Sequence, residues 1–288
     1  MISTRIPRFA PLGALLLCAA LAGCDTVSRV GPTAQIAVLE EESKETTSAN
    51  IGSLSEVIQR NPSDPSAYNT RGAAYAKVGR YGDAIADFDK AVQADPNYAP
   101  AYTNRGLANR QTNRNDVALA DFSRAIASDP NYGPAYLGRA NLLRVQGNFP
   151  EALADLSQAI RLTPESAEAL HARGLVYQRM GEHQKAILDF HAAIDRNPFV
   201  GAPYTARGQS LVQTSQFDKA VEDFNAALNV DNRNGEAWAW RGVALERSGK
   251  RPEAIESYQR ALSVQASNTT AKQGLARVQG GGGLALFR

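Results

Sequence analysis

Small and apolar residues recur along most of the chain with a fixed period of 34 residues. Counted from Pro65, the eighth residue of every unit is small: Gly72, Gly106, Ala140, Gly174, Gly208 and Gly242. Six units follow one another without insertion or deletion and end at Asn268. A period of this length indicates a repeat array, in which each unit buries its apolar face against its neighbours.

Each unit has the pattern of two helices. In the first unit, one apolar set at helical spacing precedes Gly79 and a second set follows it. These sets are Tyr68, Gly72 and Tyr75, then Ala84, Phe88 and Ala91. Gly79 suits the left-handed conformation that ends many helices. The unit is therefore predicted to be a helical hairpin with small residues at the closest helix contacts.

These units resemble tetratricopeptide repeats. The first aromatic position is held by Tyr68, Tyr102, Tyr136, Leu170, Tyr204 and Trp238, and the closing proline by Pro96, Pro130, Pro164 and Pro198. The resemblance implies an all-α, right-handed superhelical solenoid over residues 65–268, with a concave and a convex face. Residues 51–64 fit the second helix of a partial preceding unit, and residues 269–279 fit a capping helix. Asn113 and Ser215 depart from the turn glycine, and Asn109 from an apolar position.

A basic and an acidic residue accompany almost every unit. The arginines are Arg71, Arg105, Arg139, Arg173, Arg207 and Arg241, and the aspartates are Asp87, Asp121, Asp155, Asp189 and Asp223. We favour a structural ladder of ion pairs within or between units, because bidentate pairs fix geometry. The alternative is a row of arginines that awaits carboxylates in the groove. Arg241 is expected to be the free one, since Ser257 replaces its aspartate.

The resemblance also implies which residues line the concave groove. They are Asn69, Lys77, Thr103, Asn104, Leu107, Arg110, Gln111, Asn141, Arg144, His171, Leu175, Arg179, Thr205, Gln209, Trp240 and Arg247. No three successive units contain the Lys and Asn pattern of the carboxylate clamp of chaperone-binding members, so we expect other partners: envelope proteins or extended peptides. Trp240 is either an interface anchor or packed on the final helix.

The first 23 residues predict a lipoprotein signal peptide. Arg5 and Arg8 precede a short apolar run, and Leu21 to Cys24 resemble a lipobox, which makes Cys24 the lipid-bearing first mature residue. Residues 24–50 are predicted to comprise this cysteine and a flexible polar tether between the lipid and the repeats. The expected location is the periplasmic side of the cell envelope, and the residues are compatible with either membrane. Residues 280–288 form a glycine-rich tail.

Charge and composition narrow the function further. The chain has 31 basic and 29 acidic residues, and cleavage of the signal peptide would remove Arg5 and Arg8. The mature chain would then have balanced charge, so no basic surface field that attracts nucleic acid is predicted. Cys18 leaves with the signal, so no internal disulfide is expected. His171, His183 and His191 belong to different faces of the fourth unit and predict no metal site. No catalytic motif or cofactor-binding loop is present.

Three functional hypotheses follow. The first is a non-enzymatic adaptor, because the chain resembles the NlpI-like tetratricopeptide lipoproteins, which bring substrates such as cell-wall hydrolases to an envelope protease. The second is a structural subunit of an outer-membrane or secretion complex. The third, an enzyme, is disfavoured, because the short segment after Asn268 predicts no catalytic domain. The flanking segments also allow a homodimer.

Overall fold

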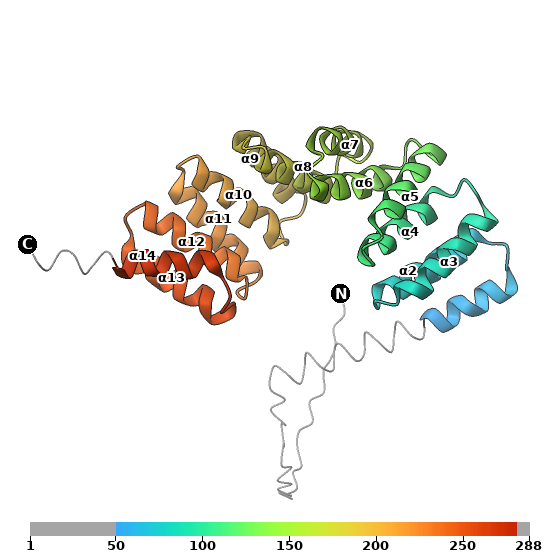
Figure 1. Ribbon diagram of the computed structural model, residues 1–288, viewed down its shortest axis with the longest axis horizontal. Helices are drawn as coiled ribbons and strands as arrows, with labels where there is room; N and C mark the ends of the chain where they lie inside the picture. The colour runs from blue at the N-terminus through green and yellow to red at the C-terminus, as the bar shows by residue number, and fades with distance from the viewer. Residues whose placement is uncertain (1–49, 281–288) are drawn as a thin grey trace, which may run out of the picture. The chain divides into compact units, whose positions relative to one another are not determined.

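The computed structural model describes residues 50–280, and its regular structure there is helical throughout. The first helices of the six units are α2 (Pro65–Lys77), α4 (Ala99–Gln111), α6 (Gly133–Gln146), α8 (Ala167–Arg179), α10 (Gly201–Gln213) and α12 (Gly235–Arg247). The second helices are α3 (Tyr81–Ala94), α5 (Asn115–Ser128), α7 (Phe149–Leu162), α9 (His183–Arg196), α11 (Phe217–Val230) and α13 (Arg251–Val264). A helix at residues 50–60 precedes them, and α14 (Thr269–Gly280) follows (Figure 1). The predicted all-α solenoid is confirmed, with its six hairpins, partial first unit and capping helix. The predicted signal peptide, the predicted lipidation site at Cys24 and the residues from 281 onward lie outside the described residues.

The hairpins stack in two layers. Each first helix packs against its own second helix and also contacts the first helix of the next unit, as α4 contacts both α2 and α6. Within residues 50–280, no such contact joins one second helix to the next. A stack whose first helices approach more closely than its second helices must curve with the first helices inside. Helices α2, α4, α6, α8, α10 and α12 therefore form the inner face.

Glycine and a buried aromatic ring form the central contact of most hairpins. A methyl group added at Gly208 would lie 2.6 Å from the nearest ring carbon of Phe224, and the same clash arises between Gly174 and Phe190. The third unit carries Ala140 opposite Leu156 instead, and both are fully buried. The small residue of the first helix thus matches the bulk of the side chain on the second.

The turn inside every hairpin contains one residue with left-handed backbone. Four of these residues are glycines, whereas Asn113 and Ser215 both have φ of 59°. Asparagine tolerates this region better than serine does, because its side chain can bond locally to the backbone. Ser215 therefore carries the less favourable of the two substitutions for glycine.

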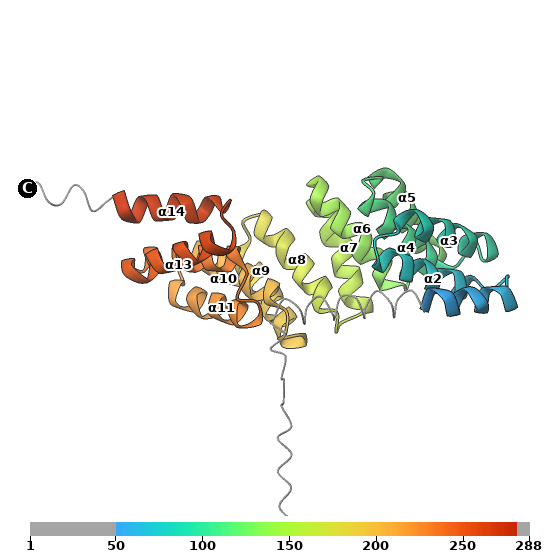
Figure 2. The ribbon, with the colours of Figure 1, turned by 90° about the horizontal axis from the view of Figure 1, so that it is seen from below.

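A polar cluster of side chains from α12, α13 and α14 joins the capping helix to the last repeat unit. Tyr258 on α13 replaces the phenylalanine of other units, and its hydroxyl donates to the Glu246 carboxylate at 2.5 Å. Arg277 of α14 donates two hydrogen bonds to the same carboxylate, at 2.9 and 3.0 Å. The bond to Arg277 lowers the pKa of Glu246, and burial together with Glu246 raises the pKa of Tyr258. Figure 2 shows α14 lying along α13. The hydrogen bonds of the cluster join α14 to the last unit.

We expect Tyr258→Phe to loosen α14 while leaving the other units folded. The change removes one hydrogen bond to a charged group, which contributes about 1.5 to 3 kcal/mol. Amide hydrogen exchange should become faster in α14 than in α8. Equal acceleration in both helices would contradict a local role for the cluster.

Candidate functional site

The repeated arginines and aspartates are joined in the structure. In five units the arginine forms at least two hydrogen bonds with the aspartate of its own unit. The shortest nitrogen–oxygen distances are 2.6 to 2.8 Å. Every one of these aspartates is at most 6% exposed. The hydrogen bond to the aspartate raises the pKa of Arg139 and of Arg173. These arginines hold the two helices of a unit together and are not offered to a ligand.

Several of these arginines also reach back to the preceding unit. Nη1 of Arg105 donates to Asp89 at 2.6 Å, and Nη1 of Arg71 donates to Ser55 at 2.9 Å. The corresponding partners of Arg139 and Arg207 are Ser123 and a ring nitrogen of His191. One guanidinium thus ties three helices, which fixes the position of each unit on its neighbour. These partners in the preceding unit were not predicted from the sequence, although each lies 16 residues before its arginine.

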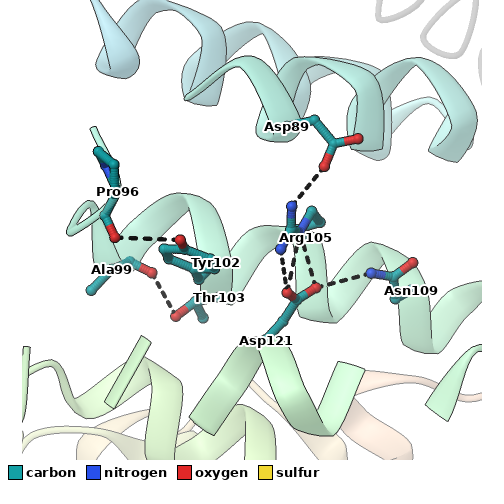
Figure 3. A network of polar contacts seen from close by, with 8 residues as sticks. All are labelled: Asp89, Pro96, Ala99, Tyr102, Thr103, Arg105, Asn109 and Asp121. Atoms are coloured by element: carbon teal, nitrogen blue, oxygen red, sulfur yellow. Dashed lines mark hydrogen bonds and ion pairs between the residues drawn. The ribbon is translucent and has the colours of Figure 1, made fainter. Parts of the chain in front are cut away.

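Figure 3 shows the most connected arginine of the series. Arg105 lies between Asp89 of α3 and Asp121 of α5, and the buried Asn109 donates to Asp121 at 3.0 Å. This bond explains why a polar residue replaces the apolar one expected at Asn109. The side-chain Oδ1 of Asn109 is buried and has no hydrogen-bond partner among residues 50–280. Within these residues, the side-chain amide of Asn109 is therefore bonded to Asp121 alone.

Arg241 is not free, in contrast to the sequence-based expectation. Its Nη1 donates to the Ser257 hydroxyl at 2.6 Å and its Nε donates to Asn225 at 2.8 Å. Ser257 takes the place of an aspartate as a neutral acceptor. The prediction was wrong because it considered only carboxylates as partners.

The predicted groove residues differ in their availability. Lys77, Gln111, Arg179 and Arg247 are exposed on the inner face, and Arg110, Asn141, Arg144, His171 and Leu175 are half-buried. Asn104 and Leu107 line a cavity of about 270 Å³ between α2 and α4. The amide of Asn104 donates to Asn69, and that of Gln209 to Glu236, so these amides are already bonded.

Thr103 does not line an accessible surface. Its side chain is 2% exposed, and its hydroxyl donates to the carbonyl of Ala99, one turn earlier in α4, as Figure 3 also shows. Thr205, its counterpart in α10, is 7% exposed and donates to Gly201. Their assignment to the groove was wrong, because short side chains at this position are covered when the next first helix packs on them.

Trp240 is half-buried and packs against the core of the last units. A ring held in this way has part of its surface already removed from water. Its contribution as an interface anchor is correspondingly smaller than that of an exposed tryptophan.

A basic cluster occupies the middle of the inner face. It consists of Arg110, Arg144 and Arg179, which lie in the last turns of α4, α6 and α8, together with His171. Burial lowers the pKa of Arg144, and the charges of Arg179 and Arg110 lower it further. Burial, aided by Arg144, lowers the pKa of His171 to about 4, so its imidazole is neutral at neutral pH. His171 also lines a cavity of about 240 Å³ between α8 and α10.

The described residues contain neither a candidate membrane-spanning helix nor a cluster of metal ligands. Between residues 50 and 280, no helix combines the length and the apolar character needed to cross a membrane. The same residues bring no three His, Cys, Asp or Glu side chains together as a metal site.

These repeat units match sequence models of known repeat families. Sequence models described as tetratricopeptide repeat match residues 65–98, 99–132, 167–199 and 205–269, and one described as TPR repeat matches residues 140–181. No curated protein sequence matches the chain significantly.

Solved structures show the same fold at low identity. The Cut9–Hcn1 hetero-tetramer of the APC/C aligns with a TM-score of 0.69 at 18% identity over 78% of this chain, and the alignment covers 45% of the Cut9–Hcn1 chain. A structure from a functional characterization of pilF of Pseudomonas aeruginosa aligns with a TM-score of 0.68 at 18% identity, over 76% of this chain and 99% of that one. YrrB, described as having an unusual peptide-binding site, aligns with a TM-score of 0.55 at 23% identity, over 65% of this chain and 96% of that one.

Proposed function

The chain is a tetratricopeptide-repeat solenoid, and from this premise we propose that it is a non-enzymatic adaptor of the bacterial cell envelope. Its inner face holds an extended segment of a partner protein, and a lipid on Cys24 anchors it. The observation that carries the proposal is the contrast between two sets of arginines. Those of the ladder are paired within the fold, whereas Arg110, Arg144 and Arg179 have no ion-pair partner among residues 50–280. Nε of Arg144 also has no hydrogen-bond partner there.

The comparison with YrrB supports a peptide as the bound form. YrrB is described as a tetratricopeptide-repeat protein with a peptide-binding site. A row of half-buried polar side chains across several helices suits an extended segment better than a compact small molecule, because such a segment can contact successive helices in turn.

Site-specific photo-cross-linking in intact cells tests this proposal. A photoreactive amino acid replaces Gln111, which is exposed on the inner face, or Gln93, which is exposed on α3 of the outer layer. We expect protein adducts from position 111 and none from position 93, after purification through a tag in the tether and mass spectrometry. Equal adducts from both positions, or none from either, would contradict a binding role for the inner face.

The same experiment separates the adaptor from a structural subunit. An adaptor yields several soluble envelope proteins in substoichiometric amounts, such as a protease or a cell-wall hydrolase. A subunit of an outer-membrane or secretion complex yields one set of membrane partners in fixed stoichiometry.

We expect Cys24→Ser to abolish lipid attachment and cleavage before residue 24. The serine hydroxyl cannot form the thioether that carries the lipid, so the precursor should accumulate and palmitate labelling should disappear. Electrophoretic mobility and radiolabelled palmitate measure both effects, with Cys18→Ser as the matched control. A Cys24→Ser protein that is still processed and membrane-bound would overturn the lipoprotein proposal.

A further inference from the structure

The three arginines of the basic cluster lie one per unit on successive inner helices. Arg110, Arg144 and Arg179 each occupy the last turn of their helix. The ion pairs found within residues 50–280 include all five arginines that face a ladder aspartate but none of these three. Their charges are therefore not balanced by a carboxylate of the described fold.

A cation in the last turn of a helix has an ordinary structural explanation, because it interacts favourably with the helix dipole. That explanation does not account for Arg144. Its side chain is half-buried, and its Nε is shielded from solvent without a hydrogen-bond partner. Leaving such a donor unsatisfied costs free energy in the unbound protein. A carboxylate that binds the guanidinium and draws it outward would let this nitrogen form a hydrogen bond as well.

His171 supplies a second unsatisfied group close to Arg144. Its Nε2 is shielded from solvent and has no partner, and the ring stands against Phe190 with centroids 5.6 Å apart. A neutral imidazole donates or accepts one hydrogen bond at this atom, according to its tautomer. The described fold thus leaves two polar nitrogens, from α6 and α8, buried beneath the inner face without a hydrogen bond.

We infer that Arg110, Arg144 and Arg179, together with His171, bind the carboxylates of an acidic segment of the partner protein. The inference rests on the proposed function and specifies the chemistry of its partner. Arginine is suited to this role because its planar guanidinium bonds a carboxylate through two parallel hydrogen bonds. Arg144, on the middle helix of the three, contacts the central carboxylate, and Arg110 and Arg179 contact the flanking ones.

The spacing of the helices predicts the spacing of the acids. Packed helices lie about 8 to 10 Å apart. An extended chain of the polyproline II type advances about 3.1 Å per residue and has three residues per turn, so residues three apart point to the same side. Three residues of the partner therefore span one unit. The preferred segment has an acidic residue at every third position, so that each faces a different arginine.

The surroundings favour a protein over a nucleic acid. Binding of single strands uses aromatic side chains on which bases stack. The other residues assigned to this part of the groove on α4, α6 and α8 are instead the amides and aliphatic side chains of Asn104, Leu107, Asn141 and Leu175. The balanced charge of the mature chain also provides no long-range attraction for a polyanion.

Fluorescence anisotropy with designed peptides tests the inference on the detergent-solubilised mature protein. The probe is a labelled Gly/Ser peptide with three glutamates at every third position, and the controls carry three glutamines or three contiguous glutamates. We expect the spaced glutamate peptide to bind about tenfold more tightly than the glutamine peptide, and Arg144→Gln to abolish most of that difference. Binding should weaken as salt screens the charges.

Arg114→Gln is the matched control, because Arg114 is exposed in the turn after α4. Among the described residues, its guanidinium bonds to the hydroxyl of the nearby Thr112 alone. It should bind the probe as the wild type does. Thermal unfolding provides a second measurement: Arg144→Gln removes an unpaired, half-buried charge and should melt at the same temperature as the wild type or higher. A lower melting temperature together with unchanged binding would make Arg144 a structural residue and overturn the inference.

Two other outcomes would also overturn it. Equal binding of the glutamate and glutamine peptides would exclude carboxylate recognition, and tighter binding of an oligothymidine would assign the cluster to phosphates. If the peptides fail while position 111 still cross-links a protein in cells, the acidic-segment inference fails and the proposed function stands. If position 111 captures nothing, the proposed function fails as well.

Discussion

Asp121→Ala is expected to lower the free energy of unfolding by about 3 to 5 kcal/mol, because it removes one partner of a buried ion pair. Asp121 is 4% exposed and accepts hydrogen bonds from both Arg105 and Asn109. Its loss leaves part of a guanidinium unpaired at the junction of three helices. It also leaves the whole side-chain amide of Asn109 unsatisfied, since its Oδ1 already lacks a partner among the described residues.

Urea unfolding measures this effect, and Asp89→Ala provides the matched control. Asp89 bonds the same guanidinium at the same 2.6 Å as Asp121 does, but its side chain is 47% exposed. We expect the control to lose about 1 kcal/mol or less, as surface pairs do. The combined Arg105→Leu and Asp121→Ala variant should lose less than the sum of the two single changes, because no buried charge is then left unpaired. Equal losses for Asp89→Ala and Asp121→Ala would show that burial does not govern the ladder.

The fold was predictable because its determinants repeat. The period of 34 residues and the small residue opposite a large one are read directly from the chain, and each hairpin in the structure follows them. Even the exceptions were visible: Asn113 and Ser215 occupy the turn position and adopt the left-handed backbone that glycine adopts elsewhere. Because the same packing positions recur in six units, a pattern that they share is readily distinguished from a chance one.

The site was only partly predictable, because side-chain availability depends on neighbours that sequence position does not specify. Thr103 and His171 hold the same place in their units, yet the threonine bonds its own helix while the histidine reaches a cavity. Arg241 finds two neutral acceptors where a carboxylate was sought. Such outcomes follow from side-chain length and from the packing of the next helix, which become known only in three dimensions.

Gly208→Ala is expected to lower the free energy of unfolding by about 1 to 3 kcal/mol, the cost of forcing an extra methyl group into a packed core. The new methyl carbon would lie 2.6 Å from one ring carbon of Phe224 and 2.8 Å from another. That ring is fully buried and cannot move without displacing its neighbours. The same change at Gly82, where nothing lies within 4 Å, should leave stability unchanged or raise it slightly, since alanine favours helix over glycine.

The third unit indicates how the loss at Gly208 can be reversed. There, Ala140 faces Leu156 in place of glycine and phenylalanine, and both side chains are fully buried. Phe224→Leu alone should leave a cavity and destabilise the protein, but in combination with Gly208→Ala it reproduces a pairing that the chain already contains. Urea unfolding of the double variant should therefore recover at least half of the loss caused by Gly208→Ala. If the two losses simply add, the match between small and large residues is not a local property of the hairpin, and the third unit must owe its packing to its particular neighbours.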